Sequence, residues 1–303
     1  MKKVLVLHYS QSGQLTEILK SLTSGMNANN VELEFVDIRP KNKFPFPWKG
    51  DSFFEQMPES VLGKPCELDE ITTRHDQYDL IILGYQVWFL NPSVPFNSFL
   101  QSDKARTLLN NTPVVTVAGV RNMWVMAQEK IKNELLKIGA RLVGNIILED
   151  KNPNLISVVT IQHWLFTAKK SRFLGFFPLP GVSQEDIDGA KRFGTTIEEA
   201  LLTDDCNNLQ EKLVKQNAVR IVDTIVFVEK RATTLFGIWA NLIEKKGTTP
   251  KKKKLWLRVF NYYLLFAIFI ISPIVILLYS IGRLFFLGKV KKEKLYYQGV
   301  KLK

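Results

Sequence analysis

The feature that most constrains this chain is an apolar run near its C-terminus. Residues 259–287 hold one formal charge, Arg283, among 29 positions rich in Leu, Ile, Phe and Tyr. A helix that crosses a membrane needs about 20 such residues, and the core helices of soluble proteins rarely contain so long a run. The run therefore predicts a membrane anchor.

The positive charge of the chain is concentrated around this run. Residues 1–244 hold 27 Lys and Arg against 28 Asp and Glu, whereas residues 245–303 hold 14 against one. Basic clusters at residues 251–254 and 289–294 flank the run, and anionic lipid headgroups attract each lysine by about 1 kcal/mol. The formal net charge of +12 therefore indicates a membrane partner and no nucleic acid.

Two arrangements of the run are compatible with the sequence. In the first, about 20 residues, roughly 262–281, cross the membrane and leave a basic tail outside. In the second, the chain bends at Pro273 and returns, so that both basic flanks stay on the cytoplasmic face. We favour the single span because a re-entrant turn must hide its polar backbone groups in protein. We expect the rest of the chain on the cytoplasmic face of the inner membrane, because no signal peptide is recognisable after Met1.

Short apolar segments alternate with helical patterns over residues 1–150. Strands are predicted at residues 2–8, 31–38, 80–84, 113–118 and 141–148. The clearest helical pattern runs from Trp124 to Ile138 and stops at Gly139. Strands that are apolar on both faces and alternate with helices predict a doubly wound parallel sheet of five strands. Such sheets bind ligands beyond the carboxyl ends of their strands.

Two loops at that edge carry the candidate site. The first, at residues 9–16, reads Tyr-Ser-Gln-Ser-Gly-Gln-Leu-Thr and opens into a helix whose free amides suit a phosphate. Alone, its serines could equally cap the helix. The second, at residues 84–92, reads Gly-Tyr-Gln-Val-Trp-Phe-Leu-Asn-Pro. Together the loops resemble those of the flavodoxin-like FMN-binding family, although Gln14, Leu15 and Gln86 depart from its usual residues.

The resemblance implies FMN as the cofactor, bound by three loops. The residues expected to hold its phosphate are Ser10, Ser12, Gly13, Gln14 and Thr16. The residues expected to contact its ring are Gln86, Val87, Trp88 and Phe89 on one side and Gly119, Val120 and Asn122 on the other. The Trp88 indole offers a flat face for stacking on the ring, unless it is simply part of the core.

The layout also resembles the flavodoxin-like proteins encoded with dialkylresorcinol and flexirubin-type pigment pathways, which are often called condensing enzymes. Condensation needs an activated cysteine with histidine partners, and Cys66 lies in the acidic segment KPCELDE without them. The resemblance instead implies oxidative aromatisation of a dialkyl cyclohexanedione to a dialkylresorcinol. Arg121 is the candidate for stabilising an enolate, and His163 or Tyr85 for proton transfer.

Two apolar aromatic insertions, at residues 40–66 and 151–182, leave the sheet at the same edge. They favour a hydrophobic small-molecule substrate, unless they pack on helices beyond the sheet or touch the bilayer. We expect a flavodoxin-like domain at residues 1–203, an amphipathic helical extension at 204–250 and a membrane segment at 251–303. Apolar residues of the extension recur every three or four positions from Ile221 to Leu242. This seam needs a partner, which is the domain, a second subunit in a homodimer, or the membrane.

Three functions remain after these observations. The leading hypothesis is a membrane-attached FMN-dependent oxidoreductase, acting as an aromatase-type dehydrogenase or as an NAD(P)H:quinone reductase. The second is an electron-transfer flavodoxin that serves a membrane partner, and the third is a membrane adaptor without flavin. We favour the enzyme because the soluble part is near neutral and carries two long apolar insertions. The two cysteines fit neither a disulfide framework nor a metal site.

Overall fold

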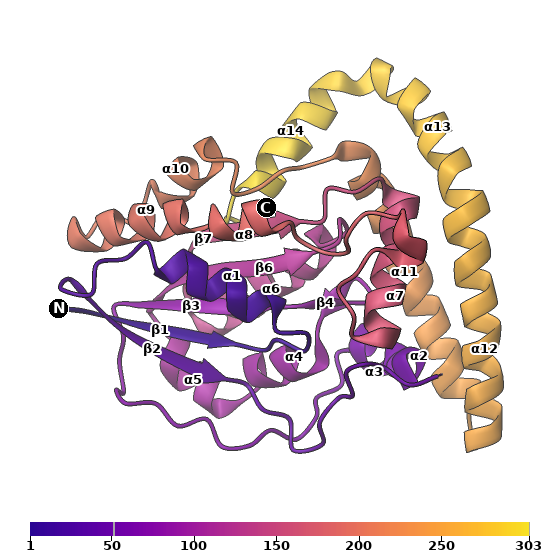
Figure 1. Ribbon diagram of the computed structural model, residues 1–303, viewed down its shortest axis with the longest axis horizontal. Coiled ribbons are helices and arrows are strands. Elements are labelled where there is room, and N and C mark those ends of the chain that lie inside the picture. The colour runs from indigo at the N-terminus through magenta and orange to yellow at the C-terminus, as the bar shows by residue number, and fades with distance from the viewer. Residues whose placement is uncertain (51, 303) are drawn as a thin grey trace.

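The computed structural model describes residues 1–50 and 52–302, and a parallel sheet lies at its centre (Figure 1). The five strands lie in the order β2 (Val31–Asp37), β1 (Lys2–His8), β3 (Leu80–Tyr85), β6 (Pro113–Val120) and β7 (Arg141–Glu149). This order is that of the flavodoxin-like doubly wound fold, so the predicted fold class is confirmed. A short antiparallel ribbon of β4 (Val87–Trp88) and β5 (Asn91–Pro92) lies beyond β3.

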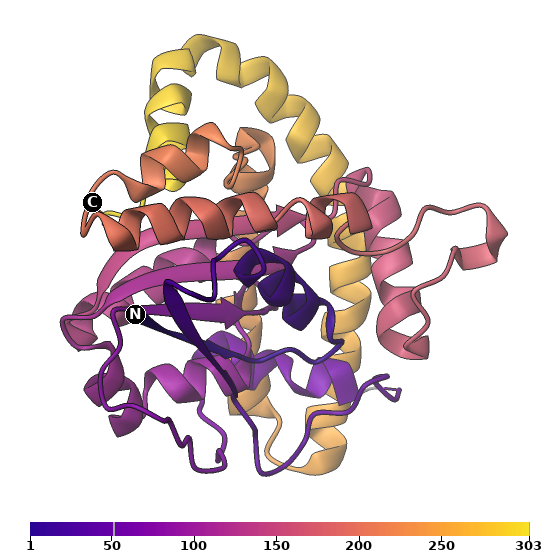
Figure 2. The same ribbon diagram turned by 60° about the vertical axis from the view of Figure 1, so that its left-hand side comes forward.

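Helices cover both faces of the sheet. One face carries α1 (Gln14–Thr23), α8 (Gln184–Asp188), α9 (Lys191–Leu202) and α10 (Leu209–Lys215), and the other carries α4 (Val94–Leu100), α5 (Asp103–Leu109) and α6 (Val125–Ile138) (Figures 1 and 2). The α6 helix ends at Gly139, as predicted, with a left-handed φ of 84°. Gly189 and Ala190 form a turn that separates α8 from α9.

The register of the strands aligns their carboxyl ends. His8 lies opposite Gly84, and Tyr85 lies opposite Ala118. The chain therefore leaves β1, β3 and β6 at one edge, and the three turns that follow are neighbours. The backbone amide of Tyr9 joins two of them by donating to the carbonyl oxygen of Gly84 at 3.3 Å.

The two insertions form helices at this edge. The first contains α2 (Ser52–Glu55) and α3 (Met57–Leu62), and the second contains α7 (Asn154–Thr167) and a 3-10 turn, η1 (Phe173–Gly175). The α7 helix was not predicted, because its apolar residues surround the helix and do not mark one face.

The helical extension consists mainly of α11 (Asp223–Lys246), which packs against α3 and the C-terminal helix. The predicted seam from Ile221 to Leu242 is misplaced by about one position. The residues of α11 that are buried are Val226, Glu229, Phe236, Ala240 and Ile243, whereas Leu235 is 40% exposed. The buried stripe is the one that faces the elements packed on α11, which are α3, α6, α12 and α13.

The apolar run belongs to one long helical segment at the side of the domain. It comprises α12 (Pro250–Phe266), a π turn η2 (Ala267–Ile271), α13 (Ser272–Gly282), a 3-10 turn η3 (Arg283–Phe286) and α14 (Leu287–Gln298). Among the described residues, this 49-residue segment is the one helix that is long and apolar enough to cross a membrane.

The course of this segment differs from the re-entrant arrangement that the sequence suggested. The bend at Pro273 that the second arrangement requires is not seen, because the π turn before Pro273 accommodates its missing amide and the helix continues. The chain turns after Gly282 instead, and α14 returns to the domain (Figure 1). The basic tail therefore lies against the domain and not apart from it.

The fold can be tested by substitution at the point where α1 and α9 cross. A methyl group on Gly194 would lie 1.9 Å from the carbonyl oxygen of Leu22, whereas one on Gly237 in α11 would meet no atom within 4 Å. We expect Gly194→Ala to destabilise the protein by about 1–3 kcal/mol through overpacking. Gly237→Ala should stabilise it by about 0.5–1 kcal/mol, because alanine loses less backbone entropy in a helix. Chemical denaturation in mild detergent measures both, and equal effects would contradict the crossing.

Candidate functional site

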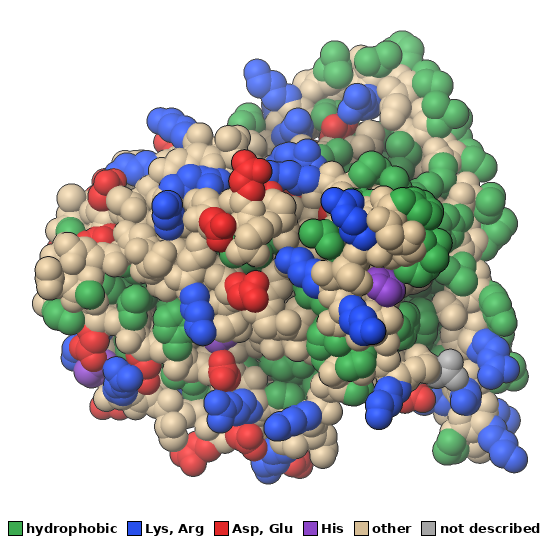
Figure 3. Space-filling view, viewed as in Figure 1, with side chains coloured by type: hydrophobic (Ala, Val, Ile, Leu, Met, Phe, Trp, Pro, Cys, Tyr) green, Lys and Arg blue, Asp and Glu red, His purple; other side chains and the backbone are tan. Residues whose placement is uncertain are grey.

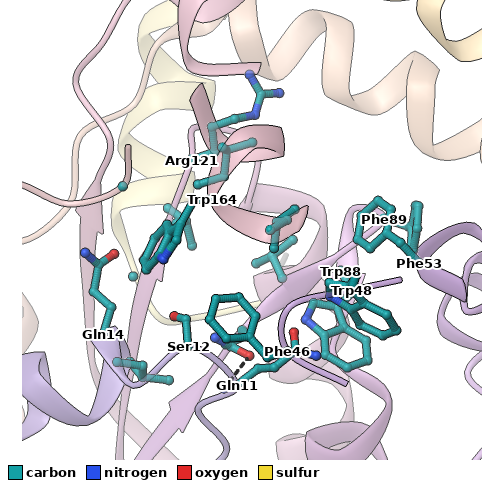
Figure 4. A pocket seen from close by; sticks show the side chains of 18 of the residues that line it. Gln11, Ser12, Gln14, Phe46, Trp48, Phe53, Trp88, Phe89, Arg121 and Trp164 are labelled. Carbon is teal, nitrogen blue, oxygen red and sulfur yellow. Dashed lines mark hydrogen bonds between the residues drawn. The ribbon is translucent and has the colours of Figure 1, made fainter. Parts of the chain in front are cut away.

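A cavity of about 280 Å³ lies at the carboxyl edge of the sheet, between the aligned turns and the two insertions (Figure 4). Its walls come from the turns after β1, β3 and β6 and from both insertions. The residues that line it are Gln11, Ser12, Gln14, Leu15, Phe46, Trp48, Phe53, Gln86, Val87, Trp88, Phe89, Leu90, Gly119, Val120, Arg121, Met123, Ile161, Trp164, Leu165 and Gly181. Most of these side chains are apolar or aromatic, so the cavity suits a largely hydrophobic ligand.

The turn after β1 presents polar groups without partners at the start of α1. Gly13 precedes the helix with a φ of 86°, and no side chain caps the helix there. The hydroxyl of Ser10 is shielded from solvent and makes no hydrogen bond to any described residue. Free amides and an orphaned hydroxyl at a helix N-terminus suit an anion such as a phosphate.

The side chains of two other residues of this loop have partners within the fold. The side-chain Nε2 of Gln14 donates to the carbonyl oxygen of Val182 at 3.2 Å, and its Oε1 accepts from the backbone amide of Val182 at 3.1 Å. The hydroxyl of Thr16 is bonded to Nε2 of His8 at 2.9 Å. Both side chains are therefore engaged in holding the fold, although Gln14 still lines the cavity wall. Burial lowers the pKa of His8, which is only 2% exposed and structural.

The turn between β4 and β5 is strained and points into the cavity. Phe89 and Leu90 have φ values of 48° and 63°, which side chains other than glycine rarely adopt. Two such residues in a two-residue hairpin are usually Asn and Gly. Residues in this conformation concentrate at functional sites, and both of these line the cavity.

The side chain of Gln86 joins this turn to the first one. Its Oε1 accepts a hydrogen bond from the backbone amide of Gln11 at 3.2 Å. The rings of Tyr9 and Trp88 are also in contact, edge to face, at 5.8 Å. The two loops that carry the family resemblance are thus held together, as the sequence predicted.

Trp88 lies in an aromatic cluster and forms part of the cavity wall. It is 8% exposed, and its ring meets Phe44 at 5.1 Å and Trp48 at 5.6 Å, both edge to face. Residues of the first insertion therefore fix the orientation of the indole. Both alternatives for Trp88 hold in part, because it belongs to the core and also borders the cavity.

Among the described residues that line the cavity, Arg121 is the only one with a charged side chain. Its Nη1 donates to Asn154 at Oδ1 (2.7 Å) and at the backbone oxygen (3.2 Å), at the start of α7. Burial lowers its pKa to about 10, an effect that the nearby carboxylates of Asp150 and Glu229 oppose. Arg121 therefore stays cationic at neutral pH and places a positive charge at the border of an apolar cavity, with its guanidinium directed away from the aromatic walls (Figure 4).

The other two catalytic candidates do not reach the cavity. Tyr85 is fully buried and donates from its hydroxyl to Oε1 of Gln128 at 2.9 Å, on the α6 side of the sheet. Burial raises the pKa of this hydroxyl. The ring of His163 lies on the outer side of α7, where Nε2 is 3.3 Å from the hydroxyl of Ser171. Both proton-transfer assignments are therefore wrong.

Asn122 is close to the site but acts indirectly. Its side-chain amide donates to Oδ1 of Asn154 at 2.6 Å, so it positions the residue that holds Arg121. Asn154 was missed in the sequence, as were Ile161 and Gly181, whereas Met123 lies within the range 119–124 that was expected along the ring. The Pro-Asn pair at residues 153 and 154, a common helix start, was the available signal.

The two insertions meet above the cavity. The backbone amide of Trp48 donates to the carbonyl oxygen of Leu165 at 2.9 Å, and the rings of Phe46 and Trp164 lie 6.4 Å apart. The carboxylate of Asp150, at the end of β7, fixes the second insertion by accepting from Ser157 and Gly181. The aromatic residues 173–177 lie outside the cavity, and Phe176 is 70% exposed.

Neither a metal site nor a reactive thiol lies here in the described part of the chain. No group of three His, Cys, Asp or Glu side chains there could hold a metal ion. Cys66 is half-buried, and burial raises the pKa of its thiol, which makes it a poorer nucleophile.

No protein-family profile and no curated protein matches this sequence. Similar solved structures include a flavoprotein in complex with FMN from Lactobacillus acidophilus NCFM, with 18% identity, 48% of this chain and 93% of that chain covered, and a TM-score of 0.40. A flavodoxin from the domain Archaea has 12% identity, covers 66% of this chain and 99% of its own, and has a TM-score of 0.37. A flavone reductase has 10% identity, covers 66% and 63%, and has a TM-score of 0.36. These likenesses are too weak to assign the chain to a family.

A buried carboxyl behind the site couples stability to pH. Oε1 of Glu229 accepts from the backbone amide of Met126 at 2.8 Å, at the start of α6. Burial raises the pKa of Glu229 to about 8, although this bond opposes the shift. The folded state therefore retains a proton that the unfolded state releases above its ordinary carboxyl pKa, so stability falls as pH rises towards 8.

We expect Glu229→Gln to flatten this pH dependence, because glutamine keeps the acceptor oxygen and does not titrate. Denaturation midpoints measured from pH 5 to 8 should fall steeply for the natural protein and less steeply for the variant. Glu17→Gln, at an exposed position of α1, serves as the matched control and should leave the slope unchanged. A variant with the natural slope would contradict this role of Glu229.

Proposed function

We propose that this protein is a membrane-attached, FMN-dependent oxidoreductase that acts on a hydrophobic cyclic diketone or quinone-like substrate. The observation that carries the proposal is the junction of an uncapped helix N-terminus with an aromatic cavity that contains one cation. The phosphate of FMN would lie against the amides and hydroxyls from Ser10 to Gly13. Its ring would lie between the turn from Gln86 to Phe89 and the turn from Gly119 to Arg121.

The lining of the cavity supports a substrate with a small acidic head and alkyl chains. Arg121 would attract an enolate or phenolate oxygen, and the aromatic side chains of both insertions would surround hydrocarbon. Bound FMN would accept the two electrons that such a substrate loses on oxidation. Within the described lining no carboxylate or imidazole is placed to act as a base. An enolised 1,3-diketone needs little help from a base, because it is already acidic.

Within this class, the most specific proposal is the aromatisation of a dialkyl cyclohexanedione to a dialkylresorcinol. The substrate would lose two electrons and two protons, and Arg121 would hold its oxygen in the anionic form. The resemblance of the sequence to flavodoxin-like proteins of dialkylresorcinol pathways motivates this choice. The apolar walls and the single cation are compatible with it.

An NAD(P)H:quinone reductase or an electron-transfer flavodoxin is the alternative. An electron carrier needs its flavin edge open to a partner protein. The contacts of Trp48 with Leu165 and of Phe46 with Trp164 close the two insertions over the cavity instead. This cover favours an enzyme with its own substrate pocket.

FMN binding is the first test. We expect the purified protein to be yellow, or to quench the fluorescence of added FMN. Ser12→Asp should weaken FMN binding at least tenfold, because a carboxylate beside the phosphate position repels it. Ser102→Asp, at the N-cap of α5 and outside the cavity, should bind FMN like the natural protein. A colourless protein that ignores added FMN would overturn the proposal.

The substrate class is tested by two aromatic residues of the second insertion. Trp164 lines the cavity, whereas Phe177 does not. With a long-chain dialkyl cyclohexanedione, Trp164→Ser should raise KM at least tenfold because the alkyl chain loses its wall. Phe177→Ser should leave KM close to that of the natural enzyme. Both variants should reduce a small quinone normally, and a Trp164→Ser enzyme with unchanged KM for the long-chain substrate would count against the alkyl site.

A further inference from the structure

One side of the apolar segment is covered by α11 along its length. In the second half of α12, the ring of Phe260 packs on Phe236 at 5.5 Å and on Trp239 at 5.7 Å. Near the end of α13, Tyr279 stacks on Phe227 at 3.9 Å. The two helices therefore stay in contact from one end of α11 to the other.

The opposite side of the segment is an unbroken apolar face. Its residues, which we call the apolar ridge, are each at least half exposed and are Tyr262, Phe266, Ile270, Ile274, Leu277 and Ile281. Their spacing of three or four positions places them on one side of the helix. Hydrophobic side chains follow this edge of the molecule in the space-filling view (Figure 3).

Both ends of the ridge carry positive charge. Lys251 and Lys252 are exposed before it, and Lys289, Lys291 and Lys292 are exposed after it. A hydrophobic strip with lysines at each end is complementary to a bilayer with anionic headgroups, because the strip enters the acyl boundary while the lysines reach the headgroups.

Polar contacts tie both ends of the segment to the soluble domain. At the start, Lys253 pairs with Glu59 of α3 at 2.9 Å. At the turn after α13, Arg283 makes two contacts to the carboxylate of Asp223, at 2.8 and 3.0 Å. Such ties hold the segment parallel to the surface of the domain.

The last helix strengthens this attachment. In α14, Glu293 pairs with Lys230 at 3.0 Å, and Tyr297 is 8% exposed. Gln210 of α10 donates to the carbonyl oxygen of Gln298 at 2.6 Å. A helix that crossed the bilayer would pull α14 to the far side and break these contacts.

A crossing would also separate α12 and α13 from α11 or draw α11 into the lipid. The α11 helix carries Glu229, Lys230 and Arg231, and charged side chains are costly inside a bilayer. Neither outcome is compatible with the packing of the segment.

We propose that the apolar ridge docks flat on an anionic bilayer, in the plane of one leaflet, and that the segment does not cross the membrane. The C-terminus then stays on the same side as the domain. This inference concerns how the protein meets the membrane and is independent of FMN, so it stands or falls separately from the proposed activity.

The proposal predicts that all residues of the apolar ridge lie at the same depth in the bilayer. In full-length protein with Cys66 and Cys206 replaced by serine, single cysteines at positions 262, 270 and 281 are labelled with a fluorophore. Quenching by lipids brominated at different acyl depths is then measured in vesicles of phosphatidylglycerol and phosphatidylcholine. We expect the same shallow depth at all three positions and no quenching for a label at Leu136, which is exposed on α6. A deep position 270 between shallow ends would indicate a span and overturn the proposal.

Binding measurements with unlabelled variants provide a second test. Ile270→Asp combined with Leu277→Asp should reduce partitioning into these vesicles at least tenfold, whereas Leu136→Asp should not. Each of Lys251, Lys289 and Lys291 changed to Gln should lower partitioning by roughly fivefold at low salt. Circular dichroism confirms that the variants fold.

Three results would overturn the docking proposal. One is partitioning that does not change in the ridge variant. Another is a natural protein that ignores vesicles but forms a dimer that the ridge variant abolishes, because the ridge would then bind a second copy. A tag after Lys303 that protease removes from outside intact spheroplasts would likewise establish a crossing.

Discussion

The aligned carboxyl ends of β1, β3 and β6 are the constraint on which the site depends. Parallel pairing fixes His8 beside Gly84 and Tyr85 beside Ala118, and three turns must then emerge together. The hydrogen bond from Gln11 to Gln86 and the contact of Tyr9 with Trp88 follow from this proximity. Without the register, the hydroxyl-rich turn and the aromatic turn would be unrelated loops.

The α11 helix links this site to the surface of the apolar segment. Its Glu229 reaches the start of α6 behind Arg121, while Phe236 and Ala240 pack with Met57 of α3 and Phe260 of α12. Phe89, from the strained turn, packs against the same cluster and also lines the cavity. The cavity and the apolar ridge are therefore attached to one continuous hydrophobic layer, which keeps an oily ligand and an oily surface close together.

Two charged groups, Arg121 and Asp150, lie at the border of this layer, and both have hydrogen-bond partners. Arg121 is held by Asn154, and Asn122 donates to the same Oδ1, so one asparagine fixes the cation at the border of the cavity. The carboxylate of Asp150 is satisfied by amide and hydroxyl donors of the second insertion. These bonds hold the second insertion at the end of β7.

The sequence by itself determined the strands, their order of appearance and the two candidate loops. Their apolar runs are buried on both faces, and the Ser-Gln-Ser-Gly loop precedes a helix, so short-range pattern was sufficient. The sequence also determined that residues 259–287 need an apolar environment, because no arrangement of α11 alone could cover every side of such a helix.

Only the tertiary structure decided which candidates face the cavity. Successive side chains of a strand point to opposite faces, so Tyr85 enters the core beside Gln128 while Gln86 meets the ligand side. Only the tertiary structure placed His163 on the outer side of α7. It also decided that α14 returns to the domain, because this return depends on contacts with residues far away in the chain, such as Lys230 and Gln210.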